Sequence, residues 1–127
     1  MDRLKFSFPA QLPLLNGVIH DLFFWDNSIK IFKNSLLIRC FHEDLSKQKV
    51  IKTNILRDVI TCPVYKIWIV IKNIEAIKYL NIEELNCINY MSYKNNELFI
   101  NIGTSKNILL ITKNFEIEVR KKHIKYD

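Results

Sequence analysis

The chain offers few side chains whose type and spacing could support catalysis. His20 and Asp21 form an adjacent acid–base pair. We place them in an extended segment, residues 18–25, where successive side chains point to opposite faces and could not act together on one substrate group. The sequence also contains no Gly-rich phosphate loop, no Gly-x-Ser-x-Gly elbow and no His-Glu-x-x-His pair. We therefore predict that the protein is not an enzyme.

Metal binding is the second chemistry that these residue types could support. Three cysteines, Cys40, Cys62 and Cys87, are an odd number without a close pair, so neither a disulfide framework nor a ribbon-type zinc site is indicated. Cys40 and His42 would share a strand face, and His20 could approach them from a neighbouring strand, but the spacing supplies no second tight pair of ligands. We predict reduced, buried thiols, no bound metal and no cofactor.

Nucleic-acid binding is the alternative function. The chain has two Trp, five Tyr and eight Phe, with basic residues between some of them, as in residues 65–68 and 90–94, so a basic and aromatic sheet face could stack bases. Against this, Trp68 and Tyr65 lie within apolar stretches typical of a core, and the basic residues are spread along the chain. An RNP-type signature is absent.

Size and composition indicate one globular domain. The chain has 127 residues, 49% of them hydrophobic, and a net charge of +6. We expect a single β-rich domain over residues 1–127, with residues 1–10 as an N-terminal strand or arm and residues 120–127 as a basic tail. No apolar run approaches the roughly 18 residues of a membrane helix, and the first residues lack the features of a secretory signal. We therefore expect a cytoplasmic protein without a membrane partner.

Short apolar stretches closed by polar corners favour strands over helices. Residues 115–120 alternate strictly, and residues 98–102 and 108–111 continue the pattern, which predicts an antiparallel meander in the carboxyl-terminal third. Residues 18–25, 29–32 and 36–41 predict two further hairpins. Residues 64–71 are apolar on nearly both faces and predict a central strand covered on each side. The expected fold class is mainly β, with antiparallel meander sheets packed as a sandwich or half-barrel and at most one or two short helices.

Two segments are less clear. Residues 44–60 carry apolar positions that fit a helical face, yet their β-branched residues suit a strand, so we favour a loop followed by a strand and leave the helix open. Residues 81–85, with Asn81 as the cap and Glu83 and Glu84 in the first turn, predict one short helix.

Tight turns must use asparagine, because the chain has only two glycines. Asparagine tolerates a left-handed backbone better than other residues with a side chain. Asn27, Asn34, Asn96 and Asn114 lie where such turns are expected.

A wider pattern resembles a known family. Its features are a Leu-Pro-Leu-Leu run at residues 12–15 before a hairpin, Pro63 followed by Trp68, an apolar strand that continues into residues 73–80, and a closing β meander. Over about residues 10–119 this arrangement resembles the bacterial polymorphic-toxin immunity proteins of the family numbered fifty. The resemblance implies a β scaffold that binds a cognate toxin domain and neutralises it by occlusion. Immunity proteins that face basic nucleases are commonly acidic, so a charge of +6 argues against a nuclease partner.

Protein interfaces draw most of their energy from a few exposed aromatic or Arg anchors. Trp25 with Asp26, at the end of one strand, and Tyr93 with Lys94, beside a turn, are the partner-binding residues that we predict. The competing interpretation of Trp25 is a cap on the core, because Phe23 and Phe24 precede it. The sequence leaves the toxin and the oligomeric state open.

Overall fold

A computed structural model describes residues 2–43, 49–53, 58–61, 64–103 and 106–124. Two single-turn 3-10 helices, at Pro9–Gln11 and Asp26–Ser28, accompany one α-helix and the strands. In chain order these are β1 (Asp2–Phe6), α1 (Leu12–Ile19), β2 (Phe23–Trp25), β3 (Ile29–Phe32), β4 (Ser35–Glu43), β5 (Lys49–Thr53), β6 (Asp58–Thr61), β7 (Val64–Lys72), β8 (Ala76–Leu80), β9 (Leu85–Lys94), β10 (Glu97–Ile102), β11 (Lys106–Ile111) and β12 (Glu116–Ile124).

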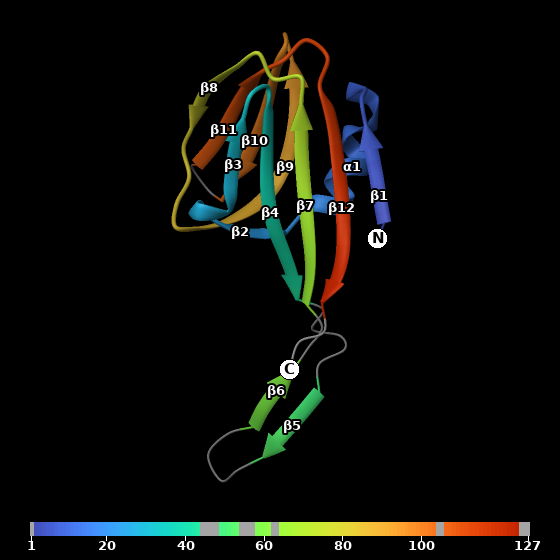
Figure 1. Cartoon of the computed structure of the whole chain (residues 1–127), viewed down its shortest axis with the longest axis vertical. Coiled ribbons are helices and arrows are strands. Elements are labelled where there is room, and N and C mark those ends of the chain that lie inside the picture. Colours follow the sequence, from blue (N-terminus) through green and yellow to red (C-terminus); the bar gives the residue numbers. More distant parts are fainter. Residues whose placement is uncertain (1, 44–48, 54–57, 62–63, 104–105, 125–127) are drawn as a thin grey trace.

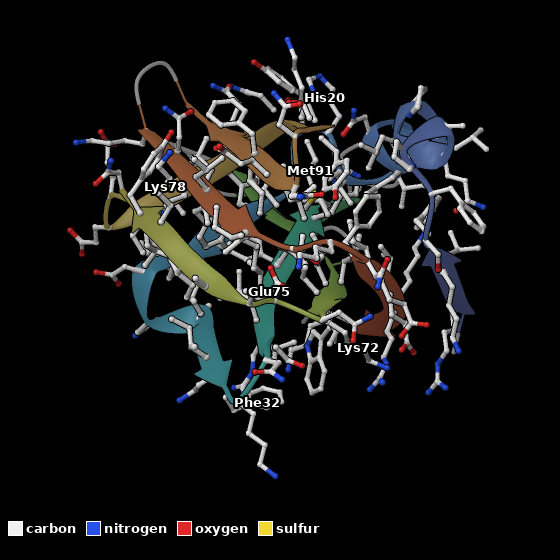
Figure 2. The ribbon with its side chains drawn as sticks, turned by 90° about the horizontal axis from the view of Figure 1, so that it is seen from above. His20, Phe32, Lys72, Glu75, Lys78 and Met91 are labelled. Carbon is white, nitrogen blue, oxygen red and sulfur yellow. The ribbon has the colours of Figure 1, made fainter. Side chains whose placement is uncertain are left out.

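Ten strands form one antiparallel sheet, which confirms the mainly β fold class. The strand order is β1-β12-β7-β4-β2-β9-β10-β11-β8, and β3 pairs with β4 beside β2. The sheet bends back on itself where the short strand β2 joins β4 to β9. Figures 1 and 2 show the result, in which β4, β7 and β12 face a second layer of β9, β10, β11 and β8.

The core lies between these two layers. Because side chains alternate along a strand, each strand turns every second residue inward, as at Leu36 and Ile38 of β4 and Ile69 and Ile71 of β7, all fully buried. Opposite them lie Met91, Leu98, Ile100, Ile108 and Leu110 from β9, β10 and β11. Each strand therefore has one face of side chains in the core and the opposite face on the outside of the bent sheet.

The strand predicted at residues 18–25 is only partly confirmed: residues 23–25 form β2, whereas residues 18–19 belong to helix α1. Pro13 lies in its first turn, and Leu12, Leu15 and Ile19 are buried at helical spacing. The helix covers the edge of β9 beyond its pairing with β2. There the side chain of Asn16 accepts a hydrogen bond from the Met91 amide at 2.8 Å and donates one to the Met91 carbonyl at 3.0 Å.

The pairing of the strands also differs from two expectations. The amino-terminal hairpin of residues 18–25 with 29–32 does not form, because β2 pairs with β4 and β9 while β3 pairs with β4. Of the meander predicted over residues 98–120, β10 and β11 pair as expected, with β9 on the other side of β10. β12 does not join them and lies between β1 and β7. β7 is central as predicted, between β4 and β12, yet only its inward face is wholly buried.

Three further segments complete the comparison. Within residues 44–60, β5 and β6 pair as a separate two-stranded hairpin that projects beyond the end of the sheet (Figure 1), while residues 44–48 and 54–57 lie outside the described part. The helix predicted at residues 81–85 is absent from this described segment, and β9 begins at Leu85. The expected basic tail instead continues β12 as far as Ile124, and residues 125–127 are outside the description.

Left-handed backbone occurs mostly at other residues than those predicted. Of the four asparagines, Asn96 has a positive φ of 62°, whereas Asn27, Asn34 and Asn114 do not. Gly103 has a φ of 64°, and the remaining positions with positive φ are Asp21, Lys33, Asn73 and Asn95. Within residues 2–124, as far as they are described, the structure has no helix long and apolar enough to cross a bilayer.

The contact between Asn16 and Met91 gives the first prediction. Asn16→Ala should lower the free energy of unfolding by about 1–3 kcal/mol, because it leaves the buried Met91 amide and carbonyl without partners. Gly17→Ala, at a helical position with nothing within 4 Å of an added Cβ, should instead raise stability by about 0.5–1 kcal/mol. Urea unfolding of the two variants and the wild type measures both; an Asn16→Ala protein as stable as the wild type would contradict this role.

Candidate functional site

Five large apolar side chains are exposed together on the outside of the sheet. We call Phe23, Trp25, Phe41, Trp68 and Leu85 the outer aromatic patch. Exposure runs from 37% for Trp68 to 45% for Leu85, and Phe41 is half-buried. Strand alternation places them there, because their neighbours Phe24, Cys40 and Ile69 point into the core.

The strand register makes these side chains one continuous surface. Trp25 is opposite Leu85, and Phe23 is opposite Phe41, with ring centroids 5.9 Å apart and planes inclined by 28°. Phe41 is opposite Lys66, which makes Trp68 its diagonal neighbour on β7. The patch therefore extends across β9, β2, β4 and β7 without a change of face.

Basic residues extend the same surface. On the outer faces of β3, β4, β7, β12 and β1, the side chains that the structure describes include seven cations and two carboxylates. The cations are Arg3, Lys5, Lys30, Arg39, Lys66, Lys72 and Arg120, and the carboxylates are Glu116 and Glu118. The Arg39 guanidinium lies over the Trp68 ring, 5.5 Å from its centroid, so aromatic and basic groups are in direct contact.

Glu118 is a buried carboxylate within this basic surface. Its Oε1 lies 2.7 Å from Arg3 Nε and 2.9 Å from Arg120 Nε, and its Oε2 lies 3.5 Å from Lys72 Nζ. Only 1% of the residue is exposed. The hydrogen bond from Arg120 holds the pKa of the Glu118 carboxyl below its usual value of 4.5; burial opposes this shift, and the charges of Arg120, Arg3 and Lys72 support it.

The structure separates the predicted partner-binding residues into two places. Trp25 is exposed on the outer aromatic patch. Asp26 follows it in a 3-10 turn, and the Asp26 amide donates a hydrogen bond to the Glu84 carbonyl. Tyr93 and Lys94 lie at the far end of β9, eight residues beyond Leu85, which is roughly 26 Å along an extended strand. The two pairs therefore do not form one site.

Tyr93 is fixed in a structural role. Its hydroxyl donates to the Thr112 carbonyl at 2.7 Å, and its ring meets Phe115 edge-on at a centroid distance of 4.9 Å. These contacts tie β9 to the segment that leads into β12. Lys94 beside it is exposed.

The outer aromatic patch contains residues that the sequence analysis placed in the core. Trp68 is the main correction, since 37% of it is exposed on the outward side of β7. Its two same-face neighbours on the strand are Lys66 and Val70, with Lys72 one step further. Two lysines in phase with Trp68 were the available signal that this face meets water.

The acid–base and metal candidates do not form a reactive centre. His20 and Asp21 follow helix α1 instead of sharing a strand, so their side chains do meet, with Nε2 3.3 Å from Oδ2, but both are exposed. His20 Nδ1 lies 3.0 Å from the Asn89 carbonyl oxygen. Among the residues with described positions, no group of three or more His, Cys, Asp or Glu could hold a metal ion.

Burial is the main influence on the pKa of the described cysteine thiols. Cys40 is buried in the core, and this raises the pKa of its thiol. Cys87 is half-buried; burial and the negative charge of Asp21 raise the pKa of its thiol. Neither environment activates a nucleophile, because a raised pKa lowers the thiolate fraction. Cys62 lies outside the described residues.

No protein-family model, curated protein or solved structure matches this chain.

The Glu118 network gives a pH-dependent prediction. Glu118→Gln should lower the free energy of unfolding by about 1–3 kcal/mol at neutral pH, because three cations lose their shared counter-charge. A folded-state pKa below 4.5 means that this stabilisation is present above pH 4.5 and is lost as the pH falls through the folded-state pKa. The wild type and Glu118→Gln should therefore converge in acid.

Urea unfolding at neutral pH and at about pH 3 measures this convergence. Glu116→Gln is the matched control: Glu116 lies on the same strand as Glu118 and pairs with Lys72 of β7 at 3.4 Å, but it is partly exposed. Such pairs are worth about 1 kcal/mol or less. A gap between wild type and Glu118→Gln that is the same at both pH values would contradict the network.

Proposed function

We propose that this protein is a non-enzymatic immunity-type protein, which binds a cognate toxin domain through the outer aromatic patch and neutralises it by occlusion. The observation that carries the proposal is the exposure of Phe23, Trp25, Trp68 and Leu85 as neighbours on one face of the sheet. Soluble monomeric proteins rarely expose a large contiguous apolar surface without a binding role.

The composition of the surface fits a protein interface. Trp, Tyr and Arg dominate the residues that contribute most binding energy, and they act best when surrounded by groups that exclude water. The outer aromatic patch contains both tryptophans of the chain, with Arg39 against one of them. Lys66 and the half-buried Leu37 lie alongside and extend the surface toward a standard interface of about 800 Å² per partner.

The scaffold also suits tight binding. β4 and β7 are each hydrogen-bonded to strands on both sides, and their inward faces form the core. The residues that carry the patch are thus already ordered, and little conformational entropy is lost when a partner docks. A rigid surface of this kind inhibits by covering a partner's active site and needs no chemistry of its own.

The anchor role of Trp25 gives the test of this proposal. We expect an adjacent reading frame to encode a large secreted protein with a variable carboxyl-terminal domain, and this domain is the probe. Trp25→Ala should weaken its binding at least tenfold, or by about 1.4 kcal/mol or more, as loss of a hot-spot aromatic does. The thermal midpoint should not change, because Trp25 is outside the core.

Tyr90→Ala is the matched control. Tyr90 has the same 44% exposure as Trp25, but it lies on β9 beside Phe99, outside the patch. Isothermal titration calorimetry with both variants compares them. Equal affinities for Trp25→Ala and the wild type would refute the patch as the binding surface, and failure of the wild type to bind the domain would refute the immunity function.

Nucleic-acid binding is the second candidate, and the seven cations on the same outer face favour it. It predicts an affinity for single-stranded RNA or DNA that falls steeply with salt, as counterions are released. Titration of labelled RNA and DNA at two salt concentrations checks it. We expect weak binding at both, and sub-micromolar affinity with a steep salt slope would favour this second function.

A further inference from the structure

Four outward residues on four adjacent strands form a row next to the outer aromatic patch. Arg39 of β4 is opposite Trp68 of β7, Trp68 is opposite Arg120 of β12, and Arg120 is opposite Arg3 of β1. Neighbouring strands lie about 4.8 Å apart, so the row spans about 15 Å. We call these four residues the arginine row.

Each guanidinium in the row is held by a specific contact. Arg39 lies over the Trp68 ring at 5.5 Å. Arg3 and Arg120 both contact Glu118 Oε1 through their Nε atoms, at 2.7 and 2.9 Å. The positively charged groups are thus oriented before any partner arrives, and less side-chain entropy is lost on binding.

The arrangement is unfavourable for the isolated protein. Arg3 and Arg120 are directly opposite each other, and like charges in this position destabilise a strand pair. Glu118 offsets their repulsion but is itself buried, which adds a desolvation cost. A strand pair that needed only stability would be better served by apolar or oppositely charged partners.

We infer that the arginine row binds carboxylates on an acidic protein surface; this inference rests on the proposed function and adds the chemistry of the partner. A guanidinium matches a carboxylate with two parallel hydrogen bonds. Among the side chains that the structure describes on this face, seven cations against two carboxylates make it complementary to an acidic surface. The adjacent outer aromatic patch supplies the apolar contact at the same interface.

A polynucleotide fits the row less well. Glu116 and Glu118 lie among the cations and pair with Arg3, Lys72 and Arg120, which reduces the attraction for a continuous phosphate chain. The nearby rings also contact their neighbours, Phe23 with Phe41 and Trp68 with Arg39. They therefore form a continuous surface, whereas base stacking needs rings that project from the protein.

Arg39 is the residue that tests the inference most cleanly. It contacts Trp68 and takes no part in the ion pairs that Arg3, Lys72 and Arg120 form with Glu118, so its replacement leaves that network intact. Lys78→Gln is the matched control, because it removes one positive charge on β8, and Figure 2 shows Lys78 well away from Lys72 of β7. Arg39→Lys separates the planar fork from the charge.

The probes are a labelled peptide of alternating Glu and Gly and a single-stranded DNA of equal charge, measured by fluorescence anisotropy at about 50 and 200 mM salt. Arg39→Gln should weaken peptide binding about fivefold at the lower salt, as loss of a charge-assisted surface contact does. Arg39→Lys should weaken peptide binding less, with about half the change in the logarithm of the dissociation constant. Circular dichroism checks that each variant is folded.

Three results would overturn the inference: no binding of the peptide by the wild type, the same loss of affinity in Arg39→Gln and Lys78→Gln, or tighter binding of the DNA than of the peptide. The proposed function fails separately, when Trp25→Ala binds the toxin domain as tightly as the wild type does. If Trp25→Ala weakens that complex while Arg39→Gln changes neither peptide affinity nor the association rate of the complex, only the inference fails.

Discussion

The two-residue period of the strands is the constraint on which the surface depends. A strand in a sheet that bends around one core turns only one of its faces toward that core, so every side chain out of phase with the core is turned outward. In β7 this rule buries Ile67, Ile69 and Ile71 and exposes Lys66 and Trp68. The aromatic surface is therefore fixed by the same backbone pairing that holds the core, and it cannot retract without a change of register.

Electrostatics and apolar contact have different functions on this face. A basic rim accelerates the approach of an acidic partner and discriminates against basic ones, whereas desolvated aromatic anchors slow dissociation. Arg39 connects the two, because its guanidinium lies over the Trp68 ring, while Glu118 holds Arg3 and Arg120 in fixed positions. The proposed role in occlusion needs both properties: rapid association with the target and a long-lived complex.

Local sequence patterns predicted where the strands lie better than they predicted which strands pair with one another. Alternation identified β10, β11 and β12 as strands, and the apolar run of residues 64–71 indicated the central position of β7. Alternation did not predict helix α1. There Pro13 in the first turn and the helical spacing of Leu12, Leu15 and Ile19 favour a helix more strongly than the β-branched residues that follow favour a strand. The pairing of β12 with β1 and β7, and hence the row from Arg39 to Arg3, joins segments far apart in the chain, which no local pattern encodes. Of the outer aromatic patch, the sequence predicted the exposure of Trp25 but placed Trp68 in the core.

The two tryptophans make the proposed binding surface directly observable, because the chain has no others and both are on the outer face. Their indole N–H signals can be followed by NMR while the cognate toxin domain is added. Binding at this surface predicts that both indole signals shift and become protected from solvent exchange in the complex. A complex that forms with both indole signals unchanged, while resonances of β10 and β11 shift, would contradict it.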